Sequence, residues 1–417
     1  MKIIHKTYRF AITPNKEQQI LLNKHFGCVR YVYNHFLNER KEQYVKSKKF
    51  DNYYIQAKTL TELKKNNETN WLKEVNSQTL QFSLRCLDTA YVNFFRGNTK
   101  FPKFKSKHNK NTFTVPQFVT VANNRLFIPK FKNGIKINLH RKIEGKINHC
   151  TISKTSTNKY FVSILCEVEY QTKQKTGKTI GVDLGLKTFV ITSDNVKFKN
   201  NKYTKQYEKK LKRAQKHLSH KNNGSHRYEN QRFKVAILHE KISNTRLDNL
   251  HKVSSELITD YDVICLEDLN IKGMSARCKP KQDENGKYLP NGQAVKSGLN
   301  KSINDAGWGN FVKLLEYKAE WNNKQIVKIN RFFPSSKTCN SCGWINQKLK
   351  LSDREWTCNN CNTHLDRDYN AAINILKEGQ KIISSGTDDY THRGINKTTA
   401  MLHKPMKCEI HESLIYE

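Results

Sequence analysis

Two cysteine pairs near the carboxyl end constrain this chain more than any other feature of its sequence. Cys339 and Cys342 form one Cys-x-x-Cys pair, Cys358 and Cys361 form another, and fifteen residues lie between the pairs. Two pairs at this spacing can bring four thiolates to the corners of a tetrahedron around one Zn²⁺. Four unrelated buried thiols are the alternative, and the doubled spacing disfavours it. Because four soft ligands leave no open coordination position, the sequence predicts a zinc ribbon with one structural zinc ion.

The residues around these cysteines predict the rest of the ribbon. The segment WINQKLKLSDREW, residues 344–356, is long enough for a two-stranded ribbon between the pairs. His364 is expected to be an exposed linker residue. The other seven cysteines are scattered singly along the chain, as reduced thiols are, and not in a disulfide framework. This distribution of cysteines favours a reducing, cytoplasmic location.

The charge of the chain restricts its partners. Lys and Arg number 74 against 37 Asp and Glu, which gives a formal net charge of +37 over 417 residues. Such an excess requires a polyanionic partner, and nucleic acid is the default. A membrane partner is not expected, because no stretch approaches the roughly 18 apolar residues of a spanning helix. The first residues also lack the apolar segment of a signal peptide.

Two apolar runs that end in acidic residues predict a second kind of metal site. Asp183 follows Ile180-Gly-Val182 in the first run, and Glu267 follows Val263-Ile-Cys-Leu266 in the second. An ionised carboxylate at such a place is costly unless it is paired or binds a metal. Asp183 alone could equally be a turn residue before Gly185. Two buried strands that each end in an acid favour a common site.

A third acid comes from the segment LDRDYNAAINIL, which reads as the start of a helix. Asp366 is placed to cap that helix, because carboxylates are favoured at helix N-termini. Alternatively, it supports the metal ligands without binding a metal ion itself. Asp368, two residues later, could then join Asp183 and Glu267. Three carboxylates suit two Mg²⁺ or Mn²⁺ ions about 3.5–4 Å apart, the arrangement that hydrolyses phosphodiester bonds.

The remaining sequence predicts several structural regions. Helical periodicity runs to about residue 97, with Leu80, Leu84 and Leu87 in one apolar stripe, and short β-type runs follow from 112 to about 170. Residues 196–252 hold sixteen Lys or Arg and four acids, with an apolar stripe at helical spacing. They predict a pair of helices. Its charged face could simply be solvated, but the surplus of positive charge favours a surface that binds a nucleic-acid backbone. Residues 270–303 are polar and aperiodic and read as a long loop. The order of strands and helices after residue 177 is compatible with a ribonuclease-H-like α/β sheet.

Four motifs in this order, GVDLGLKTF, ICLEDLNIKGM, FPSSKTCNSCG and LDRDYNAAINIL, resemble the OrfB or TnpB proteins of insertion sequences. Further likeness in YRFAITPNKEQ, GCVRYVYNHFL and FPKFKSK extends the resemblance over roughly residues 5–378. These proteins are RNA-guided DNA endonucleases that are similar to the ancestors of type V CRISPR effectors. The resemblance implies catalytic, Mg²⁺-binding roles for Asp183, Glu267 and Asp368. It also implies a guide RNA, a double-stranded DNA target read partly by base pairing, and the bacterial cytoplasm or nucleoid as location.

The family's fold implies a multidomain α/β and β-barrel protein. The resemblance places the first strand of a wedge-type β-barrel at 1–13, a helical recognition domain at 14–99 and the rest of the barrel at 100–176. An RNase H-like RuvC nuclease domain follows at 177–334, with an inserted zinc ribbon at 335–363 and a final RuvC helix at 364–380. The tail, 381–417, is expected to be partly disordered, and a monomer is favoured.

Candidate nucleic-acid contacts follow from the same resemblance together with the basic helices. They are Lys205, Lys209, Lys212, Arg213 and Lys216, with Gln78 and Gln81 as possible readers of the duplex near the target motif. The alternative for both glutamines is plain solvation on an amphipathic helix.

Two other functions use the same residues. The acidic triad could serve a DNA-strand transposase or recombination protein, although no tyrosine or serine nucleophile constellation is evident. The chain could also be a nuclease-derived regulator that only binds nucleic acid. Such a protein would be expected to have lost one acid, whereas all three are in place.

Overall fold

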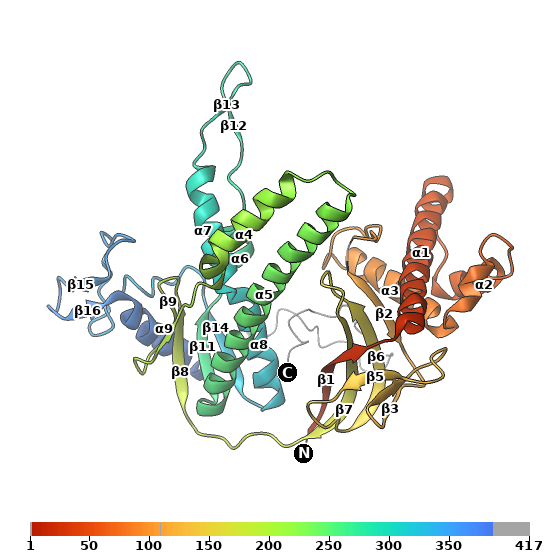
Figure 1. The fold of residues 1–417 in the computed structure, drawn as a ribbon. Coiled ribbons are helices and arrows are strands. Elements are labelled where there is room, and N and C mark those ends of the chain that lie inside the picture. Colours follow the sequence, from red (N-terminus) through yellow and green to blue (C-terminus); the bar gives the residue numbers. More distant parts are fainter. Residues whose placement is uncertain (1, 109, 387–417) are drawn as a thin grey trace. The chain divides into compact units, whose positions relative to one another are not determined.

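The computed structural model describes residues 2–108 and 110–386, which form two compact units divided in the sequence between Tyr170 and Gln171 (Figure 1). Residues 171–178, just after this division, have no regular secondary structure. No helix of the described residues is long and apolar enough to cross a lipid bilayer.

The amino-terminal unit contains one seven-stranded sheet in the order β2-β6-β7-β1-β5-β4-β3. Its strands are β1 (Lys2–Thr13), β2 (Asn111–Val115), β3 (Thr120–Ala122), β4 (Arg125–Phe127), β5 (Ile135–Asn138), β6 (Lys146–Lys154) and β7 (Tyr160–Tyr170). The first strand therefore lies inside a sheet whose other strands all come after residue 110. Within the described residues, no pairing of the edge strands β2 and β3 closes this sheet. In the described residues the predicted barrel is therefore observed as an open sheet.

Helices occupy the sequence between β1 and β2. They are α1 (Lys16–Ser47), α2 (Tyr53–Leu63), a 3₁₀ turn (Asn70–Glu74) and α3 (Ser77–Phe95). Asn15 starts α1 through a capping box, in which its side chain accepts from the backbone N–H of Gln18. The stripe Leu80, Leu84 and Leu87 is fully buried. His25 of α1 stacks on Phe113 of β2, with ring centroids 4.9 Å apart, which fixes the helical layer to the sheet.

The carboxyl-terminal unit is built around a five-stranded sheet in the order β10-β9-β8-β11-β14. The strands are β8 (Thr179–Leu184), β9 (Thr188–Thr192), β10 (Lys197–Lys199), β11 (Val263–Glu267) and β14 (Gln325–Ile329). Strands β8, β11 and β14 run parallel, whereas β9 is antiparallel to both β8 and β10. The helices are α4 (Tyr203–Ser219), α5 (His226–Asp260), α6 (Ile271–Met274), α7 (Gln293–Ala306), α8 (Trp308–Trp321) and α9 (Arg367–Ser384).

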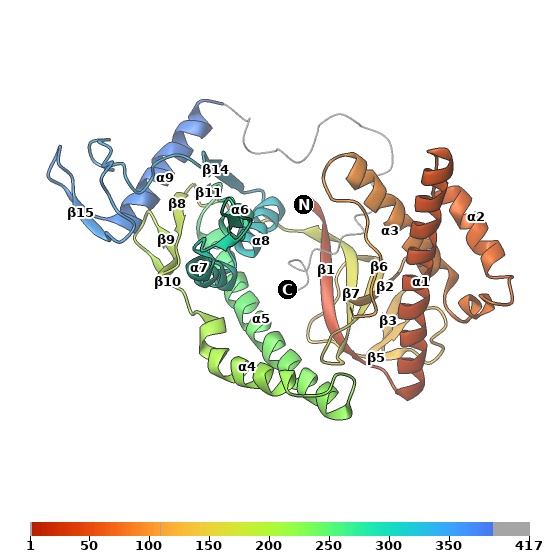
Figure 2. The same ribbon diagram turned by 90° about the horizontal axis from the view of Figure 1, so that it is seen from above.

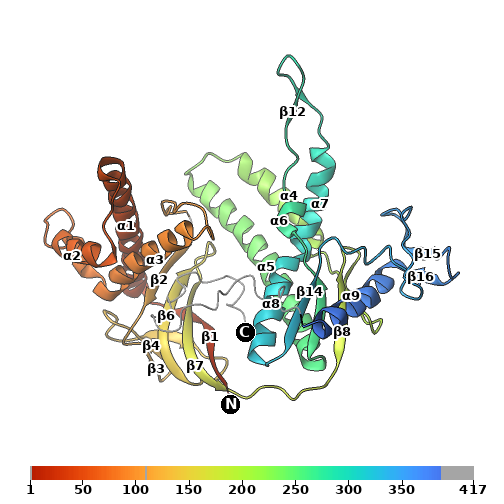
Figure 3. The same ribbon diagram turned by 180° about the vertical axis from the view of Figure 1, so that it is seen from behind.

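Alternation of side chains along the strands separates two faces of this sheet, and Figures 2 and 3 show the helices packed beside it. Ile180, Val182, Ile264 and Leu266 point into a core formed with α5 and α8. Cys265, one residue out of step, packs in a different cluster with Ile375 of α9. Because side chains alternate, Asp183 and Glu267 share the face that α9 covers.

Two glycines let α9 lie directly on that face. A Cβ at Gly181 of β8 would lie 2.1 Å from the carbonyl oxygen of Ala372 and 2.6 Å from the backbone nitrogen of Leu376. A Cβ at Gly379 of α9 would lie 2.2 Å from Sγ of Cys265. No real side chain fits at such distances, so the start of α9 reaches the strand ends only because both positions lack one.

Three sequence predictions are corrected by the observed elements. The expected loop 270–303 contains the hairpin β12 (Lys281–Gln282) and β13 (Tyr288–Leu289), and its last residues belong to α7. The ribbon strands β15 (Glu355–Thr357) and β16 (His364–Asp366) pair with each other across the second cysteine pair, not between the two pairs. His364 is exposed, as expected, but it lies in β16 and not in a linker. The last helix runs from Arg367 to Ser384, past the predicted end at 380. Residues 387–417 of the predicted tail lie outside the described residues.

Candidate metal centres

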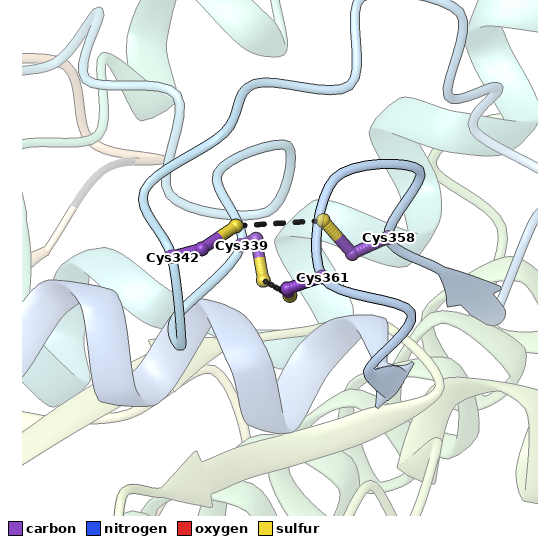
Figure 4. A group of neighbouring side chains, drawn as sticks. All are labelled: Cys339, Cys342, Cys358 and Cys361. Atoms are coloured by element: carbon purple, nitrogen blue, oxygen red, sulfur yellow. Dashed lines mark hydrogen bonds between the residues drawn. The ribbon is translucent and has the colours of Figure 1, made fainter.

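The four cysteines of the two pairs lie together at the base of β15 and β16 (Figure 4). Their sulfur atoms all lie within 4.8 Å of one another, and the Cys339–Cys361 and Cys342–Cys358 sulfur distances are both 3.6 Å. Four sulfurs about 2.3 Å from one tetrahedral ion would be about 3.8 Å apart, so the arrangement fits one zinc ion. Cys339 and Cys358 are buried, whereas Cys342 and Cys361 are exposed.

Local hydrogen bonds prepare this group for a cation. The hydroxyl and backbone of Thr363 bond to Cys361 and lower the pKa of its thiol to about 6. Backbone N–H groups shape each knuckle, with Gly343 donating to Cys339 and Asn362 donating to Cys358. Gly343 has φ = 80°, the left-handed conformation that the turn after the first pair requires. Cys339 differs, because burial raises the pKa of its thiol to about 11. The thiolate is the form that binds metal, so Cys361 is the cysteine that these hydrogen bonds favour as a ligand.

Asp183, Glu267 and Asp368 come together from β8, β11 and α9. Val182 is level with Leu266 in the parallel register, so Asp183 and Glu267 follow at neighbouring strand ends. The pKa of Asp183 is raised to about 8, first by burial and then by the negative charges of Glu267 and Asp368. Burial also raises the pKa of Glu267, against the opposite effect of a hydrogen bond from Ser335. A bound cation would favour the ionised form of Asp183, because it would offset both the burial and the neighbouring negative charges.

The acids are spread more widely than the cysteines. In the part of the chain that the structure describes, the four cysteines are the one group of three or more possible ligands gathered within 4.8 Å. The three carboxylates are therefore gathered less closely than the four sulfur atoms.

Asp366 and Asp368 differ in their contacts. Asp366 is the N-cap of α9, and its Oδ1 accepts from the backbone N–H groups of Asp368 and Tyr369 at 3.0 Å each. Burial alone would raise its pKa, but these bonds and Lys197, at 3.1 Å, lower it. Asp368 is the acid that acts on Asp183, and its ion pair with Arg354 is longer, at 3.6 Å.

The neighbouring acid Asp268 is also occupied. Arg331 forms an ion pair with its carboxylate at 2.5 Å and donates from Nε to its backbone oxygen at 2.9 Å. Glu267 instead bonds to the hydroxyl of Ser335. Sequence reasoning missed both Arg331 and Ser335, because a lone Arg and a loop Ser carry no spacing signal.

The predicted nucleic-acid contacts lie in both units. Lys205, Lys209, Lys212, Arg213 and Lys216 are all exposed on α4, a helix without a buried residue. Lys212 pairs with Glu208 at 3.1 Å, and Lys301 of α7 pairs with the same carboxylate at 2.6 Å. Gln81 is exposed on α3, whereas Gln78 is half-buried and donates to the side chain of Gln117 at 2.9 Å. The two glutamines belong to the amino-terminal unit and the five basic residues to the carboxyl-terminal unit.

Comparisons with known proteins match three segments of the chain to family models. Residues 163–277 match a family described as "Probable transposase", and residues 308–375 match a "Cas12f1-like, TNB domain". Residues 1–49 match a "Helix-turn-helix domain", although here they form β1 and α1. The fold is similar to a cryo-EM structure of a Cas12f1–sgRNA–target DNA complex, with a TM-score of 0.52 and 12% identity over 90% of this chain and 99% of that one.

Relatives of similar length define the family. A protein of Streptomyces pristinaespiralis named "Putative RNA-guided DNA endonuclease" is 34% identical over 95% of both chains. The Escherichia coli K12 protein named "Putative RNA-guided DNA endonuclease InsQ" is 32% identical over 91% of this chain and 94% of its own length. The chain belongs to the TnpB (OrfB) family of insertion-sequence proteins.

Proposed function

We propose that this chain is a transposon-encoded, RNA-guided DNA endonuclease that hydrolyses phosphodiester bonds at the acidic site of its carboxyl-terminal unit. The observation that carries the proposal is the convergence of Asp183, Glu267 and Asp368 on the α9 face of the sheet. The relatives that span nearly the whole chain carry the same name for their activity.

The acids of the site are suited to two hard cations. Carboxylate oxygens are the ligands that Mg²⁺ and Mn²⁺ prefer, and three carboxylates suit the two-ion arrangement that hydrolyses phosphodiester bonds. When bound, such ions supply an activated water and stabilise the leaving 3′ oxygen. Asp183 would lie between the other two acids and lose its proton on metal binding, and Glu267 is held by Ser335. Asp366 stays with the helix as its cap.

The supporting architecture follows the family. The five-stranded sheet with α9 would be an RNase H-like RuvC domain, and the Cys339–Cys361 segment a zinc ribbon inserted into it. The open sheet and helices of the amino-terminal unit would be the wedge and recognition domains. Guide RNA and target DNA are the proposed partners of the protein, and their phosphates would balance its net charge of +37. The exposed lysines of α4 would be among their contacts.

The test uses the protein with the RNA that copurifies with it, Mg²⁺ and plasmids carrying sequences complementary to that RNA. Cleavage should require the RNA, the matching sequence and the metal. Asp183→Ala should abolish it while RNA binding is retained. Asp260→Asn, a change at an exposed acid at the end of α5, should leave cleavage unchanged. RNA-independent strand joining would instead identify a transposase, and intact plasmids under every condition would identify a regulator.

A further inference from the structure

The loop between β14 and the first cysteine pair contacts the acidic site directly. Ser335 is 5% exposed, and its hydroxyl donates to Oε1 of Glu267. Glu267 is the last residue of β11 and is paired with Ile329 of β14, so the sheet fixes its main chain while its side chain can still adopt several rotamers. The bond from Ser335 restricts the rotation of its carboxylate.

Two asparagines on α9 hold this loop in place. Asn370 and Asn374 lie one turn apart and are 0% and 4% exposed. Their side-chain amides both donate to the carbonyl oxygen of Thr338, at 2.8 and 2.6 Å, and Asn374 also donates to the carbonyl oxygen of Ser335 at 2.8 Å. Buried amides in the middle of a helix are unfavourable unless bonded, so these bonds define where the loop lies.

The same asparagines reach the first cysteine pair. The backbone N–H of Asn340 donates to Oδ1 of Asn370 at 2.9 Å, and Thr338 and Asn340 flank Cys339 on both sides. One continuous set of contacts thus runs from Cys339 through α9 and the loop to the carboxylate of Glu267.

We propose that Ser335 is a positioning residue that orients Glu267 for divalent metal, and that Asn370 and Asn374 make this orientation depend on the cysteine site. The inference rests on the proposed function, because it assumes that Glu267 is a metal ligand. Hydrogen bonds from outside the ligand set to a ligating carboxylate set its orientation, and their loss lowers metal affinity. The cysteine site would then influence the nuclease site through this loop.

The first test measures Mn²⁺ binding by electron paramagnetic resonance on the RNA-loaded protein, beside the metal concentration that half-saturates cleavage. Ser335→Ala should weaken Mn²⁺ binding and raise that concentration by about 10-fold. Its zinc content, melting temperature and RNA binding should stay those of the original protein. Ser335→Thr keeps the hydroxyl and should restore most of the affinity, and excess Mn²⁺ should restore cleavage to Ser335→Ala.

Asp183→Ala separates this inference from the proposed function. If Mn²⁺ binding falls in Asp183→Ala but not in Ser335→Ala, the role of Ser335 is wrong and the metal site stands. If the original protein and Asp183→Ala bind Mn²⁺ equally, both the proposed metal site and the role of Ser335 are wrong.

The second test measures the dependence on the cysteine site. Removing zinc with a chelator should raise the half-saturating Mn²⁺ concentration of the original protein several-fold. In Ser335→Ala the same treatment should change it little, because the bond that carries the effect is already absent. Equal shifts in the two proteins would show that the zinc site and Glu267 are not linked through Ser335, and would overturn that part of the proposal.

Discussion

Asp366 and Asp368 are two residues apart on the same first turn of α9, and their hydrogen bonds give them different roles. Asp366 accepts two backbone N–H groups and pairs with Lys197, so its carboxylate is fully engaged. The negative charge of Asp368 raises the pKa of Asp183. We predict that Asp368→Asn lowers cleavage on the order of 100-fold or more, because a charged ligand of the site is lost. Asp366→Asn should stay close to the original rate, since Asn also caps helices well.

The measurement is single-turnover cleavage at saturating Mg²⁺ for both variants, with melting curves as the control for folding. Asp366→Ala provides a further comparison, because it removes the cap and should cost about 1 kcal/mol of stability. A large loss of cleavage in Asp366→Asn with none in Asp368→Asn would reverse the assignment of the two residues.

His25 of the amino-terminal unit makes the stability of that unit depend on pH. Burial lowers the pKa of its imidazole to about 4, with Lys130 acting in the same direction and the bond to the carbonyl of Leu21 acting against it. Its other ring nitrogen accepts the backbone N–H of Asn76 at 3.2 Å, so the ring is neutral in the folded unit.

We predict that acid destabilises the unit through His25. In the unfolded chain His25 takes up a proton below about pH 6.5, whereas the folded state resists protonation until about pH 4. The contribution of neutral His25 to the free energy of unfolding is therefore fully present above pH 6.5. It is lost as the pH falls to 4, by roughly 3 kcal/mol in all. Urea unfolding between pH 7 and pH 4.5 measures this. His25→Gln should be less stable at pH 7 but show a shallower pH slope, and an unchanged slope would contradict the prediction.

At the scale of elements, the packing of α9 on β8 depends on Gly181. A methyl group there would meet the backbone of Ala372 and Leu376, which cannot move without shifting the helix. We predict that Gly181→Ala destabilises the carboxyl-terminal unit by about 2 kcal/mol and separates Asp368 from the strand acids. Gly298→Ala in α7 is the matched control, because nothing lies within 4 Å of its Cβ position. The control should be neutral or gain roughly 0.5–1 kcal/mol.

Thermal unfolding and cleavage of the two glycine variants check this argument. The expected pattern is a lower melting temperature and weaker cleavage in Gly181→Ala alone. Equal stability of the two variants would mean that α9 can shift at little cost.

The ribbon depends on its metal, because little else holds it. Strands β15 and β16 have three residues each, and the buried cluster around them consists of Cys339, Cys358 and three apolar side chains. We predict that Cys361→Ser or zinc chelation exposes the amides of 339–366 to hydrogen exchange and leaves those of β8 and β11 protected. Cys278→Ser, outside the cluster, should retain both zinc and protection. Protection of 339–366 without zinc would contradict this.

Particular elements show what the sequence could and could not predict. Apolar runs located β8 and β11, and their parallel register explains why acids at the two ends meet. The ribbon strands were misplaced because the three residues of β16 lack an alternating pattern and are positioned by the cysteines. The helix α7 was missed because its buried residues, Ile303 and Ala306, lie only at its end. Ser335 was not predictable, since its role depends on a loop held by α9.

At the scale of the whole molecule, the charge of +37 should dominate binding to nucleic acid. The lysines of α4 differ in how far they are already neutralised. Lys205, Lys209 and Lys216 are exposed on α4, whereas Lys212 pairs with Glu208. Each cation that displaces a counterion from a phosphate adds about 0.7–0.9 to the slope of log affinity against log salt concentration.

We predict that the triple change of Lys205, Lys209 and Lys216 to Gln lowers that slope by about 2–3 for the guide RNA or the target DNA, and leaves the rate of cleavage at saturation unchanged. The control triple changes Lys24, Lys252 and Lys381, each paired with an acid, to Gln. It removes the same formal charge but should alter the slope little. Filter binding of RNA and DNA from 50 to 300 mM salt gives both slopes. Equal slopes in the two triples would mean that net charge, and not the surface of α4, determines binding.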